Sequence, residues 1–584
     1  MRRLRLAAAV ALGLLAPAPA LALTAVTTGA LDLKVTFRCI SVRAAFTQDD
    51  NANATATIRY KKSSDGTWKL AYPPIVDRRA AINRTANPYV NEARGSIVGL
   101  DPNTSYDVEV TWSDPDGVSG TNPRTGTIAT LSYDPPLPGT TKYVDPAARG
   151  GGNGTQGSPY NSIATAISNT VAGDTIILRA GTYPQTTIST SGTSRAWRRL
   201  IAFTGETPTF GSASGDVLTM NANFWVLDGL HFNTSVNSTI RIGTNAHHVF
   251  VQNSSADDIG TSGNIGNAFV SIGPGANNVY VVNNTAVRVT TAGLAAQHEN
   301  DGVYFLSNSS HSSVIEGNSL TGNFWDGIGN AGNSSLTTNE NTDYANNTIN
   351  GYTDDSIEMD GGSVNARAWG NIVITSPNRV AGPNSVFSEA GTIVGPSYIF
   401  RNVLTSTRSI SGVKQGGGGV GYCFFFHNTV ETSGRGGNEA LGCAGGPACP
   451  ILHVYKNNIL KSTGHTIDKG SSQNTYDHNL SYRPNGVEFA AAWNGKTSYT
   501  TLTTFQAGTG QEAHGKDGNP NFTDSAKHID ATSPAYESGV ILANFNTRDS
   551  IWGYTGRAPD MGAYEVGGFT SDAPAKPDGP GQRR

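Results

Sequence analysis

The sequence Asn300-Asp301-Gly302-Val303-Tyr304-Phe305 contains a motif that recurs in the middle of the chain. The motif Asp301-Gly302-Val303 recurs as Asp326-Gly327-Ile328 and as Asp355-Ser356-Ile357, at offsets of 25 and 29 residues. Offsets of this size are typical of one turn of a repeat architecture. If each phrase begins a strand, the three carboxylates stack on successive rungs of a parallel sheet, roughly 4.8 Å apart. We therefore predict a column of aspartates, with ordinary turn chemistry as the alternative reading for each one alone.

A second repeat runs through most of the chain and is marked by asparagine. Each of nine asparagines follows an apolar or aromatic strand, as in Tyr398-Ile399-Phe400-Arg401-Asn402, and the spacing between them is 22 to 34 residues. Asparagine tolerates left-handed backbone, and its amide can bond to the asparagine of the next rung. We predict that Asn318, Asn347 and Asn371 stack in one column. The nine are Asn253, Asn284, Asn318, Asn347, Asn371, Asn402, Asn428, Asn457 and Asn479.

The start of the repeat region resembles a known superfamily. Residues 158–167 have apolar residues at helical spacing, and Gly173-Asp174-Thr175-Ile176-Ile177-Leu178 and Gly181-Thr182-Tyr183 follow as a strand and a turn. This passage resembles the entry into right-handed parallel β-helix enzymes of the pectate lyase-like superfamily, and residues 558–565 resemble its close. The resemblance implies an all-β coil over residues 142–565, with the short helix covering an open sheet edge.

The segments before and after the coil have separate characters. Residues 1–22 have the charged, apolar and small-residue parts of a signal peptide. Residues 24–135 alternate apolar and polar positions between turns, which predicts a β-sandwich. Within them, residues 99–108 resemble the tyrosine corner of fibronectin type III domains. Residues 136–141 are predicted to form a linker, and residues 566–584 are predicted to form a disordered tail.

Composition narrows the class of partner. The chain has 584 residues, of which only 15% are charged, and its formal net charge is −4. This charge argues against a nucleic-acid partner, and the polar, weakly charged composition suits carbohydrate. No run after the signal peptide is apolar over the roughly 20 residues that a membrane span needs. We expect an exported, soluble monomer in which Cys443 and Cys449 form a disulfide, while Cys39 and Cys423 are buried singly.

The central acidic residues predict a metal site. Asp301, Asp326, Asp354 and Asp355 are candidate ligands for Ca²⁺, which takes oxygen donors in irregular sets. In the strand from Asp355 to Asp360, alternation points Ile357 inward and Glu358 and Asp360 outward. Asp355 shares the inward phase, so it must lie in the corner before the strand to reach a metal.

Lys414 is the candidate base. It occupies the position that corresponds to Glu358, two rungs further on. Lyases built on β-helices commonly combine acidic calcium ligands with a lysine or arginine that takes the α-proton of a uronate, so the resemblance assigns that role to Lys414, with Glu358 and Asp360 in the same cleft. The base must be neutral near the working pH, which a lysine achieves when burial or nearby cations lower its pKa. A solvated surface lysine is the alternative.

Four further residues are candidates for contact with substrate. Arg367 and Arg408 are suited to bidentate binding of a substrate carboxylate. Trp325, beside Asp326, is suited to stacking on a sugar ring, and His298, with Glu299 beside it, to supplying an acid. Ordinary packing or a surface position is the alternative for each.

Three function classes remain open. The first is a calcium-assisted lyase that cuts an acidic polysaccharide by β-elimination. The second is a glycoside hydrolase that uses carboxylate pairs among Asp355, Glu358 and Asp360. The third is a non-catalytic glycan-binding protein or adhesin. The signature motifs of pectate lyases, mannuronan epimerases and polygalacturonases have no close copy in the sequence, so the resemblance implies the fold more strongly than the activity.

Overall fold

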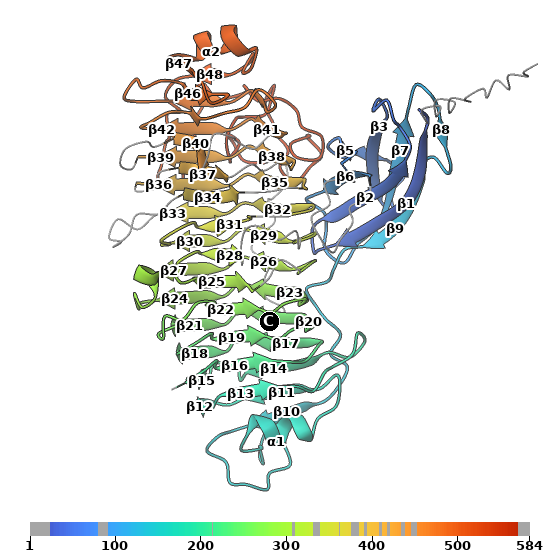
Figure 1. Ribbon diagram of the computed structural model, residues 1–584. Coiled ribbons are helices and arrows are strands. Elements are labelled where there is room, and N and C mark those ends of the chain that lie inside the picture. Colours follow the sequence, from blue (N-terminus) through green and yellow to red (C-terminus); the bar gives the residue numbers. More distant parts are fainter. Residues whose placement is uncertain are drawn as a thin grey trace, which may run out of the picture.

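The computed structural model has two parts, a small β-sandwich and a long coil of short strands beside it (Figure 1). It describes residues 24–79, 91–212, 214–306, 310–330, 339–360, 363–374, 385–390, 394–407, 411–416, 421–433, 439–444 and 452–569. None of the described helices is both long enough and apolar enough to cross a membrane.

The N-terminal part consists of two sheets packed around a common core. Ile40 and Val42 from one sheet and Ile58 and Val108 from the other are almost completely buried in it. The hydroxyl of Tyr106 accepts a hydrogen bond from the Asp101 backbone N–H at 3.0 Å, which is the contact expected of a tyrosine corner. The five-stranded sheet has the order β5 (Ile75–Asp77), β6 (Glu92–Ile97), β2 (Ile40–Thr47), β1 (Val26–Val35) and β8 (Val118–Ser119). The four-stranded sheet has the order β4 (Lys69–Leu70), β3 (Thr55–Lys62), β7 (Ser105–Ser113) and β9 (Arg124–Ala129).

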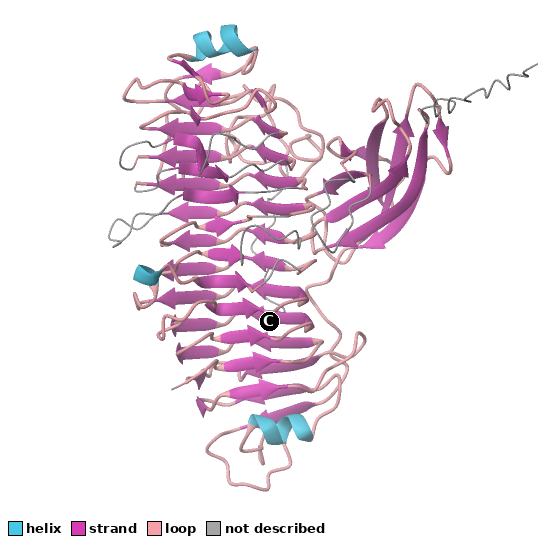
Figure 2. Ribbon diagram, viewed as in Figure 1, coloured by secondary structure: helices cyan, strands magenta, loops and turns pink. Residues whose placement is uncertain are grey.

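The rest of the chain winds into a parallel β-helix of three 13-stranded sheets, and Figure 2 shows its strands stacked along the coil. Sheet one contains β10 (Thr141–Val144), β11 (Thr175–Leu178), β14 (Arg198–Ala202), β17 (Trp225–Asp228), β20 (His247–Gln252), β23 (Asn277–Val282), β26 (Val314–Glu316), β29 (Asp343–Ala345), β32 (Ala366–Trp369), β35 (Ser397–Phe400), β38 (Cys423–Phe426), β41 (His453–Lys456) and β44 (Thr475–Asp477). Sheet two contains β12 (Gly181–Tyr183), β15 (Pro208–Phe210), β18 (His231–Thr234), β21 (Ser255–Asp258), β24 (Thr285–Arg288), β27 (Ser319–Gly322), β30 (Thr348–Asn350), β33 (Ile372–Ile374), β36 (Val403–Ser406), β39 (Thr429–Thr432), β42 (Ile459–Ser462), β45 (Leu480–Tyr482) and β48 (Lys516–Asp517).

Sheet three carries the acidic residues. It contains β13 (Thr186–Ile188), β16 (Leu218–Met220), β19 (Ile240–Ile242), β22 (Asn267–Ile272), β25 (Asn300–Phe305), β28 (Ile328–Asn330), β31 (Ile357–Glu358), β34 (Ser385–Ala390), β37 (Ser411–Gly416), β40 (Glu439–Ala444), β43 (Ile467–Asp468), β46 (Ala490–Trp493) and β47 (Thr497–Tyr499). Its apolar residues align from rung to rung, for example Val303 with Ile328 and Ile328 with Ile357, and they fill the inside of the coil.

The predicted asparagine ladder is confirmed. The amide Nδ2 of Asn318 donates to Asn347 Oδ1 at 2.9 Å, and Asn347 Nδ2 donates to Asn371 Oδ1 at 3.0 Å. Two members were misplaced by one residue: Asn253 and Asn457 have left-handed backbone, with φ of 52° and 60°, and the residues that follow them occupy the ladder column. A tight left-handed corner precedes each ladder position, and asparagine fits both places. The column runs through Ser254, Asn284, Asn318, Asn347, Asn371, Asn402, Asn428, Asn458, Asn479 and Glu512.

Helices lie at both ends of the coil. The predicted capping helix is α1 (Ile163–Ser168), whose first turn is capped by the Ser162 hydroxyl, and α2 (Leu502–Thr509) lies at the opposite end (Figure 1). A 3₁₀ turn, η1 (Leu294–Ala296), projects from the side. The last strand of the coil is β48, which is short of the expected extent. Residues 518–569 contain no described helix or strand, and they fold back so that Phe545 and Trp552 pack on Phe400.

The sandwich packs against sheet one. Phe37 stacks on Tyr133 with ring centroids 4.0 Å apart and contacts Phe250 and Tyr280 of the coil. Charged pairs join the same surfaces, including Lys34 with Glu340 at 2.5 Å. Phe250 and Tyr280 belong to sheet one, whereas Asp301 belongs to sheet three.

The cysteine predictions are tested only in part. Cys39 and Cys423 are buried, as expected. Cys443 is also buried, but Cys449 lies outside the described residues, so the disulfide between them stays a prediction.

Candidate functional site

The predicted aspartate column is present at one corner of sheet three. Asp301 Oδ1 accepts a hydrogen bond from the Asp326 backbone N–H at 3.1 Å, and Asp326 Oδ1 accepts from the Asp355 N–H at 2.8 Å. Each carboxylate therefore caps the backbone of the next rung. Asp355 lies in the corner before β31, as its inward phase required, and all three residues are 0–1% exposed. Glycine permits this tight corner, since a Cβ on Gly327 would lie 2.5 Å from the Ser356 carbonyl oxygen.

The second carboxylate oxygen of Asp301 lies beside Gly329. Asp301 Oδ2 is buried and has no hydrogen-bond partner among the described residues. A Cβ on Gly329 would overlap this oxygen and would lie 3.1 Å from Asp326 Oδ2. The glycine thus leaves space into which two buried carboxylate oxygens point. An uncompensated buried carboxylate is costly unless it is protonated or bound to a cation.

An outward-facing row lies beside the column. Glu358 pairs in register with Ser388, and Ser388 pairs with Lys414, so the predicted separation of two rungs between Glu358 and Lys414 is confirmed. Lys414 Nζ lies 2.5 Å from Asp355 Oδ2. The Ser388 hydroxyl donates to Asp360 Oδ1 at 2.6 Å. The row and the column therefore form one polar cluster.

Burial and mutual repulsion raise the pKa values of the acids. Burial, followed by the charges of neighbouring carboxylates, raises the pKa values of Asp301, Asp326 and Glu358 well above their ordinary range. The same causes raise the pKa of Glu299 to about 7. Burial also raises the pKa of Asp355 to about 7, although the Lys414 ammonium opposes it. Without a bound cation, this cluster is therefore only partly ionised at neutral pH.

The charge state of Lys414 differs from the expectation. Burial disfavours the ammonium, but Asp355 and Asp360 outweigh burial and raise the pKa of Lys414 above its ordinary value. A depressed pKa was expected because burial and nearby cations both lower the pKa of a lysine, and the opposing effect of the surrounding acids was not included. In this charge state Lys414 is a cation whose side chain is only 16% exposed.

Two groups of carboxylates are close enough to share an ion. The oxygens of Asp326, Asp354 and Asp355 lie within 4.8 Å of one another, and so do those of Glu299, Asp326 and Glu358. Asp326 belongs to both groups. All the donors are hard oxygens, which fits Ca²⁺ better than a transition metal.

Arg367 is a correction to the predicted substrate-binding set. It lies on β32 of sheet one and is completely buried. Its Nε donates to Asp343 Oδ1 at 2.5 Å, and its Nη1 donates to Ser96 Oγ of the sandwich at 3.2 Å. Arg367 therefore joins the two parts of the protein and does not face the acidic cluster.

The other predicted contact residues have varied outcomes. Trp325 is half-buried, and its carbonyl oxygen accepts hydrogen bonds from the N–H groups of Thr353 and Asp354 at 2.9 Å, which helps to position Asp354. His298 is half-buried, and its Nδ1 lies 2.6 Å from the Gly263 carbonyl oxygen. Arg408 lies outside the described residues. Substrate contact by Trp325, His298 and Arg408 stays a prediction.

Ser388 was missed by the sequence reasoning. It stands between Glu358 and Lys414 in the outward row and binds Asp360. The signal was available, because Phe387 aligns with Ile357 and Val413, and the residue after each of them faces outward.

Comparison with known proteins finds similar structures but no match in sequence. The chain is similar to pectate lyase Pel9A, with 16% identity, coverage of 73% of this chain and 96% of that chain, and a TM-score of 0.40. It is similar to a rhamnogalacturonan lyase, with 15% identity, coverage of 55% and 82%, and a TM-score of 0.38. It is also similar to the family 28 exopolygalacturonase of Yersinia enterocolitica, with 11% identity, coverage of 80% and 95%, and a TM-score of 0.31. No protein-family model and no curated protein matches the sequence.

Proposed function

We propose that this chain is an exported polysaccharide lyase that cleaves a uronate-containing polymer by calcium-assisted β-elimination. The observation that carries the proposal is the contact of Lys414 with Asp355 inside a cluster of stacked carboxylates. A carboxylate cluster suits a cation that neutralises the acid group of a uronate, and an amine beside it suits removal of a proton from the same sugar. Export rests on residues 1–22, which lie outside the described residues.

The donor set fits calcium. Asp326, Asp354 and Asp355 would hold the ion, with Asp301 in support through its buried, uncompensated Oδ2. When bound, the ion would neutralise the substrate carboxylate and so make the C5 proton more acidic. A cation bound to Asp355 would weaken the electrostatic attraction between the Asp355 carboxylate and the Lys414 ammonium. Lys414 would then lose its proton more readily.

The roles of the side chains follow from their charge states. The Lys414 amine takes the C5 proton, the electrons left at C5 form the C4–C5 double bond, and the C4–O bond to the next sugar breaks. The leaving oxygen needs a proton. Glu358 is two rungs from Lys414, and burial and the adjacent Asp360 keep it protonated, so it is the candidate donor. Ser388 orients Asp360 beside it.

A glycoside hydrolase is the second candidate, because one observation favours it. Glu299, Asp326 and Glu358 lie within 4.8 Å of one another, and the pKa of Glu299 is raised to about 7 by burial and by neighbouring carboxylates. A protonated and an ionised carboxyl at about 5 Å suit a retaining hydrolase. In that reading Lys414 positions Asp355 and takes no proton.

A substrate panel separates the two candidates. The untagged protein, with and without Ca²⁺, is incubated with pectate, alginate, glycosaminoglycans and neutral glycans. If the protein is a lyase, we expect unsaturated products that absorb at about 235 nm and a loss of activity in chelator. Saturated reducing ends made equally well in chelator would support the hydrolase. If the protein binds a glycan but releases no cleaved product from it, a non-catalytic binding protein would be favoured.

A further inference from the structure

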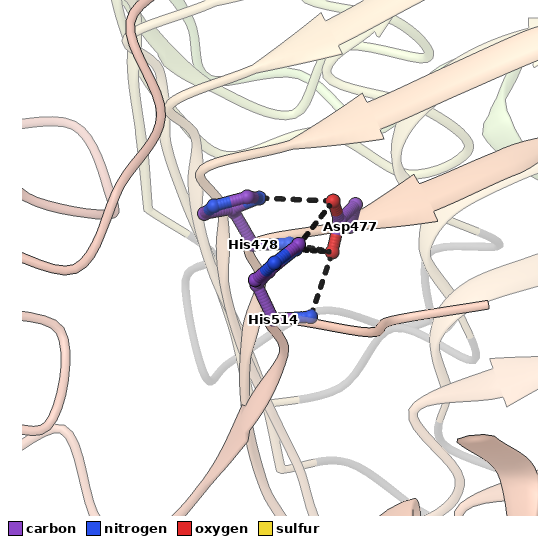
Figure 3. Close-up of side chains that lie close together, drawn as sticks. All are labelled: Asp477, His478 and His514. Carbon is purple, nitrogen blue, oxygen red and sulfur yellow. Dashed lines mark hydrogen bonds and ion pairs between the residues drawn. The ribbon is translucent and has the colours of Figure 1, made fainter. Parts of the chain in front are cut away.

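Three potential metal ligands gather near the end of the coil, away from the acidic column (Figure 3). Asp477 ends β44, and His478 is the left-handed corner residue that follows it, with φ of 56°. His514 lies 37 residues after Asp477, in the segment between α2 and β48. The close-up shows both imidazoles facing the Asp477 carboxylate.

The backbone presets the orientation of the carboxylate. Asp477 Oδ1 accepts hydrogen bonds from the N–H groups of His478 at 3.0 Å and His514 at 2.9 Å. These two contacts hold the carboxylate, so that Oδ2 lies 3.0 Å from His478 Nδ1 and 3.1 Å from His514 Nδ1. Support of a ligand by backbone donors is a common feature of metal sites.

The spacing of the ligand atoms suits one small ion. Two ligands bound at about 2.0–2.1 Å and at a tetrahedral angle lie roughly 3.3 Å apart. The Oδ2–Nδ1 separations of 3.0 and 3.1 Å are close to this value, and all three ligand atoms lie within 4.8 Å of one another.

Hydrogen bonding leaves one ligand atom unexplained. His478 Nδ1 is buried and makes no hydrogen bond of acceptable geometry among the described residues, although it lies 3.0 Å from a carboxylate oxygen. The His478 and His514 rings are stacked, with centroids 4.5 Å apart and planes inclined by 24°. The His478 Nδ1 contact is therefore an ion pair with Asp477 of imperfect hydrogen-bond geometry, and two imidazole nitrogens and one carboxylate oxygen converge where a cation could bind.

We propose that Asp477, His478 and His514 bind a divalent transition-metal ion of the zinc class. Two imidazole nitrogens and one carboxylate oxygen form a set that zinc accepts, whereas calcium prefers oxygen alone. The site is therefore chemically distinct from the acidic column. The His514 side chain is 65% exposed, which leaves a fourth position open to water or to an external ligand. The ion would tie the segment after α2 to the end of β44.

The test is zinc binding by the untagged full chain after removal of metals. Calorimetry with Zn²⁺ is done in excess Ca²⁺, which occupies the acidic column, and Co²⁺ serves as a spectroscopic probe of the ligand set. We expect one ion per chain and a higher midpoint of thermal unfolding with Zn²⁺. The variants His514→Ala and His478→Asn should each weaken binding by more than the roughly 10–100-fold loss that removal of an outer-shell partner causes. Asparagine is chosen at 478 because it tolerates the left-handed corner.

His528→Ala is the matched control. His528 Nδ1 lies 2.6 Å from Asp524 Oδ2, in an exposed histidine–aspartate pair for which no third ligand is found among the described residues. This variant should bind Zn²⁺ like the wild type. Equal binding by wild type and His514→Ala, binding lost only in Asp326→Asn, or no binding by the wild type would each overturn the proposal and leave a hydrogen-bonded cluster only.

Discussion

Lys414 lies on β37 and Asp355 lies in the corner before β31, two rungs earlier, yet Lys414 Nζ lies 2.5 Å from Asp355 Oδ2. The lysine reaches back over Ser388 to the corner of an earlier rung. Because the contact joins the outward row to the aspartate column, a base and a cation site would act on the same sugar. The predictions below test this arrangement.

Substitution of Lys414 should remove turnover. Lys414→Ala should reduce turnover at least about a hundredfold, as the loss of a general base does. Lys414→Arg should keep the pairing with Asp355 and the thermal midpoint but should also be inactive, because a guanidinium is seldom neutral. Steady-state rates and thermal unfolding of both variants provide the check. Near-normal turnover by Lys414→Arg would rule out the role as base.

The same substitution should cost stability in a pH-dependent way. The Lys414 side chain is only 16% exposed, so Lys414→Ala removes a half-buried ammonium that faces the Asp355 carboxylate. We expect a loss of about 3 kcal/mol in the free energy of unfolding at about pH 8, at the low end of the roughly 3–5 kcal/mol that breaking a buried ion pair costs. The loss should be smaller at about pH 6, where Asp355 takes up a proton. Urea unfolding at the two pH values measures the difference, and an equal loss at both would contradict it.

Calcium should bind to the aspartate column. Asp326 belongs to both carboxylate groups, so Asp326→Asn should weaken calcium binding by more than the roughly 10–100-fold effect of losing an outer-shell partner. Glu439→Gln is the matched control, because Glu439 lies on a later rung than the aspartate column. It pairs in register with Ser411 and accepts a hydrogen bond from the Ser411 hydroxyl. Calorimetry on the metal-free protein should show unchanged binding in the control. Equal weakening in both variants would point to a general loss of structure.

The stabilising effect of calcium should grow with pH. The pKa values of Glu299 and Asp355 are raised to about 7, so without a cation the stability that their protonated forms provide is present at low pH and is lost as pH rises through about 7. Calcium replaces protons in balancing these charges. The midpoint of thermal unfolding with Ca²⁺ minus that in chelator should therefore be small at about pH 5 and larger at about pH 8. Glu512, whose pKa burial raises to about 8, contributes equally with and without calcium, so the difference isolates the cluster. A constant difference across this range would count against the assignment.

The asparagine ladder should dominate the stability of the central rungs. Asn347 accepts hydrogen bonds from Asn318 and donates to the Ile315 carbonyl oxygen and to Asn371. Asn347→Ala leaves several buried groups unpaired, so it should cost about 3 kcal/mol or more at about 1 kcal/mol for each bond. Asn253→Gly is the control, because Asn253 is exposed, has φ of 52° and makes one side-chain hydrogen bond within the described part of the chain, to Asp228. The control variant should lower the free energy of unfolding, measured by chemical denaturation, by less than about 1 kcal/mol.

The columns could be predicted from the sequence because a parallel coil repeats each corner at the same position on every rung. A residue that satisfies the corner once tends to recur, which is why Asp301, Asp326 and Asp355 and the ladder asparagines were visible. The one-residue errors at Asn253 and Asn457 arose because asparagine suits both the left-handed corner and the ladder position after it. The residue type was informative, but it did not distinguish two adjacent positions.

The function of individual cations could not be predicted in the same way. Arg367 and Lys414 are both cations on strands of the coil, but Arg367 lies on sheet one under the sandwich and Lys414 lies on sheet three beside the acids. Which sheet is covered depends on contacts between residues several hundred positions apart. The Asp477, His478 and His514 group was missed for a similar reason, since His514 reaches it only after the chain has passed through α2.

The β-helix, the asparagine ladder and the aspartate column follow from the sequence alone, because each depends on a local motif repeated at a regular interval. The folded protein was needed to show that Lys414 meets Asp355, that Arg367 is buried at the interface and that Lys414 is held as a cation. Those outcomes depend on loop lengths, on the packing of the sandwich and on the electrostatic field of several buried carboxylates. None of these is a property of any single stretch of the chain.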